Sequence, residues 1–513
     1  MKALARDSIK MYISKTDFIN YLYCKKNAWL RKHKPEVAIQ KLSEFEEGTI
    51  EMGNEVEAYA REMFPAGILV KGRDQAGQTF TKDLINLEKT VIFQPVFVED
   101  VFLAAADILE RVDVADFAIS SDVPKKFNLY EVKATSEVNE SHLDDLAFQK
   151  SVIERAGLII DKTFVVHLNR HYIKKGELSL RDKFVVADVT EEVCARMSLI
   201  KEKMEEAKEY LLSGDEPIGA CDCIHEGRSN HCESFSYSNP LVPEYAVHDL
   251  AYIGRSKKKL KELINLGIYK MEEVPDDFDL DLKQMNQVIA HKYDKILIDR
   301  ALIKKELDDL IYPLYFLDYE TFAPPIPMYD GYKPFQRVPF QFSLHVLEKG
   351  ASESKHFGFL HKENSDPGPE FCEALKNLIG SEGSVVVWNK GFECSVNREL
   401  GSRLPEFKDL MEQVNVRVFD LMEVFKKQYY VHKDFKGSFS IKYVLPVLVP
   451  DFSYASLNIK EGGMASEKWR QMVLEDLTRE ERRKIAEDLT EYCKLDTYAM
   501  QKIFEALLKL CNN

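Results

Sequence analysis

The stretch YFLDYETFAPP at 315–325 carries two carboxylates, Asp318 and Glu320, inside an apolar segment that is typical of a β-strand. Side chains along a strand alternate between its two faces, so these two acids lie on the same face. An ionised carboxylate that leaves water needs a cation, a proton or another polar partner. The stretch is therefore either an exposed edge strand or one part of a cation site.

Further acids later in the chain can complete such a site. Glu393 stands in SVVVWNKGFECSVNREL, which we interpret as a strand running into a helix. Tyr492 and Asp496, in EYCKLDTYAM, are four residues apart and thus on one face of a helix. Four carboxylates from such elements suit two divalent metal ions that clamp a phosphodiester, with Tyr492 orienting the attacking water. Asp420, in RVFDLMEVF, competes with Glu393 for the third acid position.

The order of these motifs resembles the DEDD exonucleases of the RNase H-like superfamily, the DnaQ-like group. D-x-E opens the pattern, N-x-x-F-E stands where those enzymes usually have N-x-x-F-D, and Y-x-x-x-D marks the tyrosine subtype. The resemblance implies 3′–5′ exonuclease-like hydrolysis with Mg²⁺ or Mn²⁺. The metal ligands that it implies are Asp318, Glu320, Glu393 and Asp496.

A second group of chemically suited residues lies in the first half of the chain. Asp107 stands in the apolar run AAADILERVD, and Glu131 and Lys133 follow in LYEVKAT, on one face of an expected strand. Asp107 and Glu131 can hold Mg²⁺, while Lys133 can activate water and stabilise developing phosphate charge. The alternative interpretation is an ordinary cross-strand salt bridge.

This group resembles the PD-(D/E)XK nucleases of the RecB-like branch. The match consists of an acid on an upstream helix, an aspartate, E-x-K, and a glutamine on a following helix. It implies Glu57 as a further metal ligand and Gln149 as a further catalytic residue. Many relatives carry histidine in place of Glu57, and the tyrosine expected shortly after Gln149 is absent from QKSVIE. The opening YISKTDFINYLYCKKNAWL also resembles the iron–sulfur members of that branch, including the CRISPR-associated RecB-like exonucleases.

Three cysteines, Cys221, Cys223 and Cys232, form a C-x-C-x8-C motif that indicates a soft-metal site. The iron–sulfur resemblance implies Cys24 as the fourth ligand and a structural [4Fe–4S] cluster, although the closest relatives are expected to carry C-x2-C-x5-C. Zinc, with His225 or His231 as further candidate ligands, is the competing interpretation. Reduced thiols without a metal are the third.

The elements that must position these residues form an α/β pattern in two parts. We expect a PD-(D/E)XK restriction-endonuclease-like domain at 1–235, a helical connector at 236–312 and an RNase H-like domain at 313–513. In the first domain we expect a helix at 50–64, strands at 101–119, 127–135 and 162–173, and a crossover helix at 140–157. In the last we expect strands at 314–321, 341–348 and 384–389, and helices at 367–380, 391–403, 418–430 and 480–510.

Composition and charge indicate where in the cell the protein acts. The 513-residue chain has a formal net charge of −15 and no apolar run long enough for a membrane helix, and its N-terminus has no apolar core of a signal peptide, so a cytoplasmic protein is expected. The whole chain resembles uncharacterised bacterial proteins that join a RecB-like half to an RNase H-like half. We therefore expect a two-site nuclease that prefers DNA to RNA and acts in DNA repair or in defence against foreign DNA. The alternatives are a ribonuclease and a nucleic-acid-binding scaffold that does not cleave.

Overall fold

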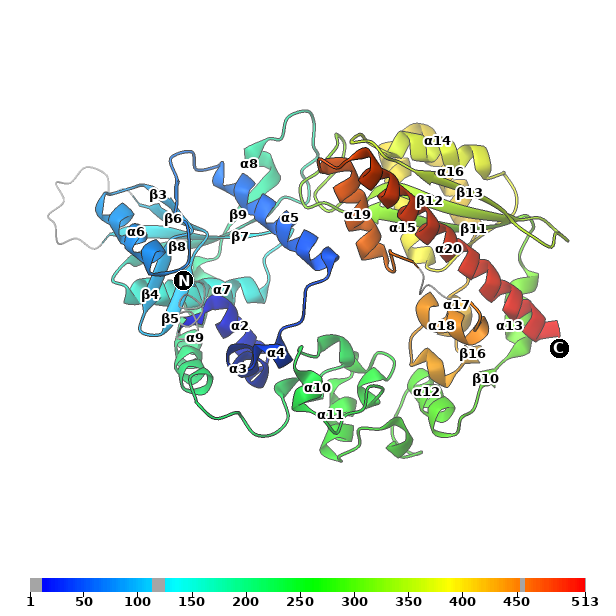
Figure 1. The fold of residues 1–513 in the computed structure, drawn as a ribbon, viewed down its shortest axis with the longest axis horizontal. Coiled ribbons are helices and arrows are strands. Elements are labelled where there is room, and N and C mark those ends of the chain that lie inside the picture. Colours follow the sequence, from blue (N-terminus) through cyan, green and yellow to red (C-terminus); the bar gives the residue numbers. More distant parts are fainter. Residues whose placement is uncertain (1–11, 113–124, 453–456, 513) are drawn as a thin grey trace.

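The computed structural model describes residues 12–112, 125–452 and 457–512. It contains two α/β lobes and a connector that is mostly helical (Figure 1). The mixed α/β class expected from the sequence is confirmed.

The first lobe is built around a six-stranded sheet in the order β2-β3-β6-β7-β8-β9, with a three-stranded sheet, β1-β5-β4, beside it. Strands β7 and β8 are parallel, and helix α7 makes the crossover between them. The strands are β1 (Ile13–Ser14), β2 (Ile68–Leu69), β3 (Val91–Phe93), β4 (Val96–Glu99), β5 (Phe102–Ala105), β6 (Ile108–Arg111), β7 (Lys126–Lys133), β8 (Ile159–Leu168) and β9 (Phe184–Asp188). The helices are α2 (Lys15–Tyr23), α3 (Lys25–His33), α4 (Pro35–Ala38), α5 (Glu44–Arg61), α6 (Gln75–Asn86), α7 (Glu140–Arg155), α8 (Leu180–Lys183) and α9 (Thr190–Leu211).

The alternation of β7 decides which side chains meet which helix. Phe127 and Leu129 belong to the core shared with α2, α7 and α9, whereas Tyr130 packs with residues of α5 on the opposite face. Glu131 and Lys133 follow the odd-numbered set and therefore point toward α7. The face that the sequence predicted to be shared by Glu131 and Lys133 is thus the one covered by the crossover helix.

The connector runs from the cysteine loop to the second lobe and has a small core of its own. Its helices are α10 (Phe235–Ser238), α11 (Lys257–Asn265), α12 (Leu282–Lys292) and α13 (Arg300–Asp308), with short 3-10 turns between them. Strand β10 (Leu297–Ile298) pairs with β16 (Tyr430–Val431) of the second lobe.

The second lobe contains a five-stranded sheet in the order β13-β12-β11-β14-β15. The pairs β13–β12 and β12–β11 are antiparallel, while β11–β14 and β14–β15 are parallel. The strands are β11 (Leu314–Phe322), β12 (Val338–Leu347), β13 (Lys355–Leu360), β14 (Ser384–Val387) and β15 (Val418–Asp420). The helices are α14 (Gly368–Leu378), α15 (Lys390–Arg403), α16 (Lys408–Val416), α17 (Glu423–Lys426), α18 (Ile441–Leu448), α19 (Gly462–Leu474) and α20 (Arg479–Asn512).

The two faces of β11 meet different helices. Tyr315, Leu317 and Tyr319 pack against the core of α14, α15 and α16. Leu314 and Phe316 pack against α20. Because side chains alternate, Asp318 and Glu320 follow the even-numbered set and also lie on the α20 face.

Several expected elements differ from those observed. The expected strand at 101–119 is broken into β5 and β6 by a bend that contains Asp107, and its last residues, 113–119, lie outside the described residues. The expected helix at 418–430 is wrong, because 418–420 pair with β14 as strand β15 and only Glu423–Lys426 are helical. Strand β13 was not expected, although it covers the edge of β12.

The lobes touch each other directly where α5 packs against α19 (Figure 1). Arg470 pairs with Glu51 of α5 and with Glu467, each at 2.7 Å, and Lys468 pairs with Glu44 at 2.8 Å. A second contact is made by backbone hydrogen bonds between Lys174 and residues 331–332. The lobes are therefore joined by packing as well as by the connector.

Two glycines in α5 test this interface. An alanine in place of a helix-interior glycine stabilises a helix by roughly 0.5–1 kcal/mol. A Cβ at Gly53 would meet open space, so Gly53→Ala should raise the midpoint of urea unfolding followed by circular dichroism. A Cβ at Gly48 would collide with the Glu467 carboxylate, which Arg470 holds in place, so Gly48→Ala should lower that midpoint. Equal gains for both variants would contradict the packing of α5 against α19.

Candidate active sites and a cysteine cluster

The first candidate site lies between β11 and α20 in the second lobe. Asp318 and Glu320 lie opposite Ser343 and Gln341 of β12, in the middle of the sheet. Asp318, Glu320 and Cys493 each present one ligand atom, and the three atoms lie within 4.8 Å of one another. The thiol of Cys493 donates to Asp318 Oδ2 at 3.8 Å.

Helix α20 is aligned over the sheet by contacts at both ends of this region. Thr478 and Glu481 form a reciprocal capping pair, in which each side chain accepts the other's backbone N–H. The hydroxyls of Thr497 and of Ser343 in β12 are hydrogen-bonded to each other at 2.7 Å. Gln341 donates to the backbone oxygen of Leu489 at 2.8 Å. These contacts place Tyr492, Cys493 and Asp496 beside the acids of β11.

The acids of this site act on one another. Burial raises the pKa of Asp318 well above its usual range, and the charge of Asp496 raises it further. Burial also raises the pKa of Glu320, with additional contributions from Asp318, Asp496 and Glu393. Burial and the charge of Asp318 raise the pKa of Glu393. Each of these acids is destabilised as an anion by its environment, and a cation would relieve that cost.

Tyr492 belongs to the same group. It is buried, and burial followed by the charge of Asp496 raises the pKa of its hydroxyl well above the usual range. The hydroxyl is hydrogen-bonded to the Asp496 carboxylate. The sequence prediction that these two residues share a helix face thus corresponds to a direct contact.

The two rivals for the third acid differ in their partners. Asp420 Oδ2 accepts from the backbone N–H of Lys390, and Oδ1 accepts from that of Met422, each at 3.1 Å. Glu393 is 2% exposed, and its Oε2 has no hydrogen-bond partner among the described residues. Asp420 therefore uses one oxygen to hold the start of α15 and the other to hold the turn that follows β15, whereas Glu393 keeps one oxygen free inside the site.

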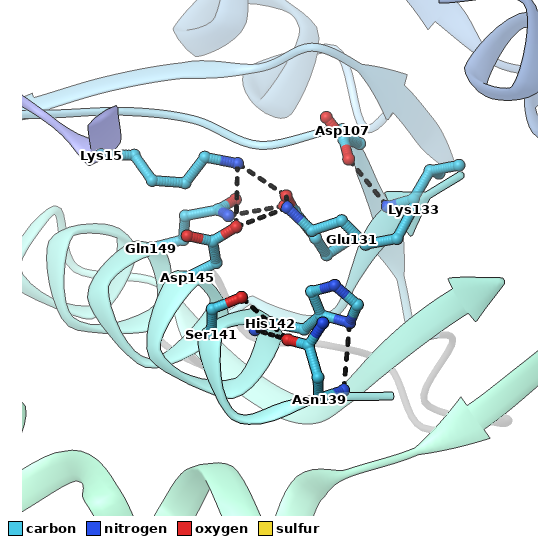
Figure 2. A network of polar contacts seen from close by, with 10 residues as sticks. Lys15, Asp107, Glu131, Lys133, Asn139, Ser141, His142, Asp145 and Gln149 are labelled. Atoms are coloured by element: carbon cyan, nitrogen blue, oxygen red, sulfur yellow. Dashed lines mark hydrogen bonds and ion pairs between the residues drawn. The ribbon is translucent and has the colours of Figure 1, made fainter. Parts of the chain in front are cut away.

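The second candidate site lies in the first lobe, on β7 and α7 (Figure 2). Glu131 is buried and accepts from three side chains: Lys15 at 2.6 Å, Lys133 at 2.8 Å and Gln149 at 2.6 Å. Lys133 also pairs with Asp145 at 2.5 Å. The result is a compact network of two lysines and two acids beneath the crossover helix.

The start of α7 positions this network. Asn139 accepts the backbone N–H of His142, and the His142 ring accepts that of Asn139, which makes a reciprocal capping box (Figure 2). With the helix begun at Glu140, Asp145 and Gln149 fall four residues apart on one face. The side chains on that face point toward Glu131.

Asp107 and Glu57 lie at the edge of the network. Asp107 Oδ2 accepts the backbone N–H of Val132 at 2.7 Å. Glu57 Oε1 accepts from Gln94 at 3.0 Å and pairs with Arg61 at 2.5 Å. Among the described residues, Glu57, Asp107 and Glu131 do not gather into a set with ligand atoms within 4.8 Å of one another.

The charges of this site separate the pKa values of its acids. Burial raises the pKa of Asp107 to about 8, with a further contribution from Glu131. Burial also opposes ionisation of Glu131, but Lys15, Lys133 and Gln149 outweigh it and lower the pKa of Glu131 to about 2. The positive charge that Glu131 needs is thus supplied by the chain itself.

Sequence reasoning missed three residues of these sites. Asp145 precedes Gln149 by four residues, and Cys493 precedes Asp496 by three, so both could have been found from helix spacing. Lys15 stands 116 residues before Glu131, and no local pattern connects them.

The four predicted cysteines form a third group. The Sγ atoms of Cys24, Cys221, Cys223 and Cys232 lie within 4.8 Å of one another, all are buried, and the set could hold a metal ion. All nine cysteines of the chain have free thiols. Neither His225 nor His231 belongs to the set; His231 Nε2 contacts the Glu226 backbone oxygen and its ring stacks on Phe235.

Comparison with known proteins gives relatives of unassigned function. Residues 315–440 match a family described as "Domain of unknown function (DUF2779)", a segment that runs from β11 to the start of α18. The chain is 21% identical to uncharacterized protein UU173 of Ureaplasma parvum over 98% of this chain and 90% of that protein. It is 28% identical to uncharacterized protein MG366 of Mycoplasma genitalium, over 37% of this chain and 31% of that protein. The homolog of MG366 in Mycoplasma pneumoniae is 26% identical over 36% and 30% of the two chains.

These matches agree with the expected likeness to uncharacterised bacterial proteins over nearly the whole chain. The chain spans about a third of the length of the two Mycoplasma proteins that it matches. The family segment contains Asp318, Glu320, Glu393 and Asp420, and it ends before Tyr492. Among the described residues, no helix combines the length and apolar character needed to cross a membrane.

The different partners of Glu393 and Asp420 can be tested by pH-dependent stability. An acid with a raised pKa in the folded state is protonated there while the unfolded chain ionises, so stability is lost as pH rises above the ordinary glutamate range near ~4. Glu393→Gln should therefore change the urea midpoint little at pH 4 and raise it increasingly toward pH 8, in the presence of a chelator.

Asp420→Asn is the matched comparison. An asparagine can accept only one of the two backbone N–H bonds, so this variant should be less stable than the parent at pH 4, by about 1–3 kcal/mol. Because burial also raises the pKa of Asp420, the deficit should narrow toward pH 8. If the responses of the two variants were exchanged, the assignment of the free oxygen to Glu393 would be wrong.

Proposed function

We propose that this protein is a metal-dependent nuclease whose main catalytic centre is the acidic site between β11 and α20. The observation that carries the proposal is the convergence of Asp318 and Glu320 with the charges of Glu393 and Asp496. Burial and neighbouring carboxylates disfavour the anionic forms of Asp318, Glu320 and Glu393. Buried acids gathered in this way are a typical environment for divalent cations.

The topology of the second lobe supports the class of enzyme. Three antiparallel strands followed by two parallel ones, in the order β13-β12-β11-β14-β15, correspond to the sheet that the RNase H-like resemblance implies. The first acids stand on the central strand, and the last stand on the C-terminal helix that covers it. This is the order in which the DEDD motifs are expected.

The residues present fit divalent ions. Asp318 and Glu320, whose oxygens lie with Cys493 Sγ within 4.8 Å of one another, would hold them together with Glu393 and Asp496. Glu393 Oε2 has no hydrogen-bond partner among the described residues and is available as a metal ligand. Bound Mg²⁺ or Mn²⁺ would polarise the phosphodiester and lower the pKa of attacking water. Tyr492, fixed by its bond to Asp496, would orient that water for attack on phosphorus.

A positively charged cavity beside α20 supports a nucleic acid as substrate. It has a volume of about 910 Å³. Its basic lining residues are Lys362, Arg479, Arg482, Arg483 and Lys494. Three glutamates also line it, so the excess of positive charge is local and modest. In a chain of net charge −15, such a local patch suits contacts with a phosphate backbone.

We extend the proposal to the first lobe as a second nuclease centre, of the PD-(D/E)XK kind. The parallel β7–α7–β8 unit and the E-x-K pair on β7 support that assignment. Lys133 would stabilise charge on the attacked phosphate, and Gln149 would orient Glu131. DNA is the preferred substrate by analogy with the RecB-like branch.

One observation favours a binding role for the first lobe. Lys15 and Lys133 both form ion pairs with the Glu131 carboxylate, so a divalent ion that binds this carboxylate would have to displace at least one of them. A first lobe that binds nucleic acid without cutting it is therefore the alternative for this half.

Cleavage assays with separate variants test both centres. Labelled single-stranded DNA, duplex DNA and RNA would be incubated with Mg²⁺ or Mn²⁺. Asp318→Asn should reduce cleavage by at least about 100-fold, because it removes one metal-binding carboxylate. Glu131→Gln reports on the first lobe in the same assay. Glu412→Gln, an exposed acid of α16, is the control and should leave cleavage unchanged.

The outcomes separate the alternatives. Cleavage of RNA alone, lost in Asp318→Asn, would favour the ribonuclease. Cleavage unaffected by Glu131→Gln would favour a binding role for the first lobe. Binding without any cleavage by the parent protein would contradict the nuclease proposal.

A further inference from the structure

The cysteine cluster has a size that distinguishes between its possible occupants. Cys24 Sγ lies 3.8 Å from Cys232 Sγ, and Cys232 Sγ lies 4.0 Å from Cys221 Sγ. All four sulfur atoms, Cys223 included, lie within 4.8 Å of one another. The four thiols thus surround one small, roughly tetrahedral space.

One metal ion fits that space. In a zinc tetrathiolate the bond to sulfur is about 2.3 Å long, which puts the corners of the tetrahedron about 3.8 Å apart. A [4Fe–4S] cubane carries one iron at each corner and needs its four cysteine sulfurs at roughly 6 Å or more from one another. The observed separations match the single ion and are too short for the cubane.

We propose that Cys24, Cys221, Cys223 and Cys232 bind a single Zn²⁺ ion in place of the [4Fe–4S] cluster that the sequence resemblance implies. The proposal is independent of the nuclease assignment, because it rests on the sulfur geometry alone. It also excludes histidine from the ligand set, since the four sulfurs complete the tetrahedron.

The surroundings of the thiols suit a permanent structural ion. Asn239 Nδ2 donates to Cys221 Sγ at 3.1 Å, and the Ser234 hydroxyl contacts Cys232 Sγ at 3.6 Å. Ser234 is itself bonded to Asn27 Oδ1 at 2.8 Å. Such partners orient thiolates and spread their charge. Since all four ligands are protein sulfurs and all are buried, there is no open position for a substrate or water.

The ion would fasten the connector to the first lobe. Cys24 lies at the junction of α2 and α3, whereas the other three cysteines come about 200 residues later and pack with connector residues such as Phe235 and Leu260. Polar contacts follow the same seam: Lys25 N–H donates to Asp222 at 2.7 Å. Zinc would thus replace the large apolar core that the small connector does not have.

Metal analysis of the full-length protein tests the proposal. Protein purified without oxygen from medium that contains both metals should be colourless and should hold about one zinc ion per chain by plasma mass spectrometry. Cys24→Ser and Cys221→Ser should lose that zinc. Cys194→Ser, which changes an exposed cysteine outside the cluster, should keep it.

A second measurement does not depend on the folding of the variants. Cobalt substituted into the parent protein should give the intense ligand-field and charge-transfer bands of a tetrahedral tetrathiolate. Removal of zinc by a chelator should make the segment between residues 212 and 256 more sensitive to protease, while the second lobe stays resistant.

Three results would overturn the proposal. The first is bound iron with a brown colour that bleaches on reduction. The second is a cobalt spectrum typical of nitrogen or oxygen ligands. The third is folded parent protein that contains well under one equivalent of any metal. Loss of cleavage activity with zinc retained would bear on the nuclease proposal alone.

Discussion

A carboxylate inside a protein must meet a positive charge, a proton or several hydrogen-bond donors, and both lobes are organised by this requirement. In the first lobe the chain supplies the charge, because Lys15 and Lys133 both contact Glu131. In the second lobe the neighbouring charges that shift the pKa values of Asp318 and Glu320 are negative. The two sites thus differ in kind: lysines of the chain neutralise the acid in the first lobe, whereas the charges that shift the pKa values of Asp318 and Glu320 are those of other acids.

The two helices that form the contact between the lobes each lie beside one of these two sites. The N-terminal half of α5 packs on α19, while Glu57 near its C-terminal end contributes to the raised pKa of Asp107 in the site of the first lobe. Helix α19 begins beside the other site, since a Cβ added to Gly462 would lie 3.4 Å from Glu320 Oε2. On the opposite side of the molecule, the cysteine cluster and the β10–β16 pair hold the ends of the connector.

The spacing of residues along the sequence correctly predicted which side chains share a face within one strand or one helix. The shared strand face of Asp318 and Glu320 and the shared helix face of Tyr492 and Asp496 follow from periods of two and 3.6 residues. Spacing did not predict the conformation of segments whose structure depends on a partner far away in the sequence. Residues 418–420 became β15 because β14 offers them a parallel edge, and the bend at Asp107 lets its carboxylate reach the backbone of Val132. Lys15 and Glu131 are 116 residues apart, and the sequence around neither residue indicates that the two side chains pair.

The choice between Glu393 and Asp420 illustrates why spacing alone could not decide the site. Both acids are buried close to α15, and both have raised pKa values, first because of burial. Asp420 stands at the end of β15 and accepts the first backbone N–H of α15, a position where a negative charge stabilises a helix start. That bond fixes where α15 begins, and so fixes the direction in which Glu393, in its first turn, enters the site. The longer glutamate arm is then the part of the site that can adjust. Asp420 acts on the site through the helix that it anchors and through its charge, which contributes to the raised pKa of Glu393.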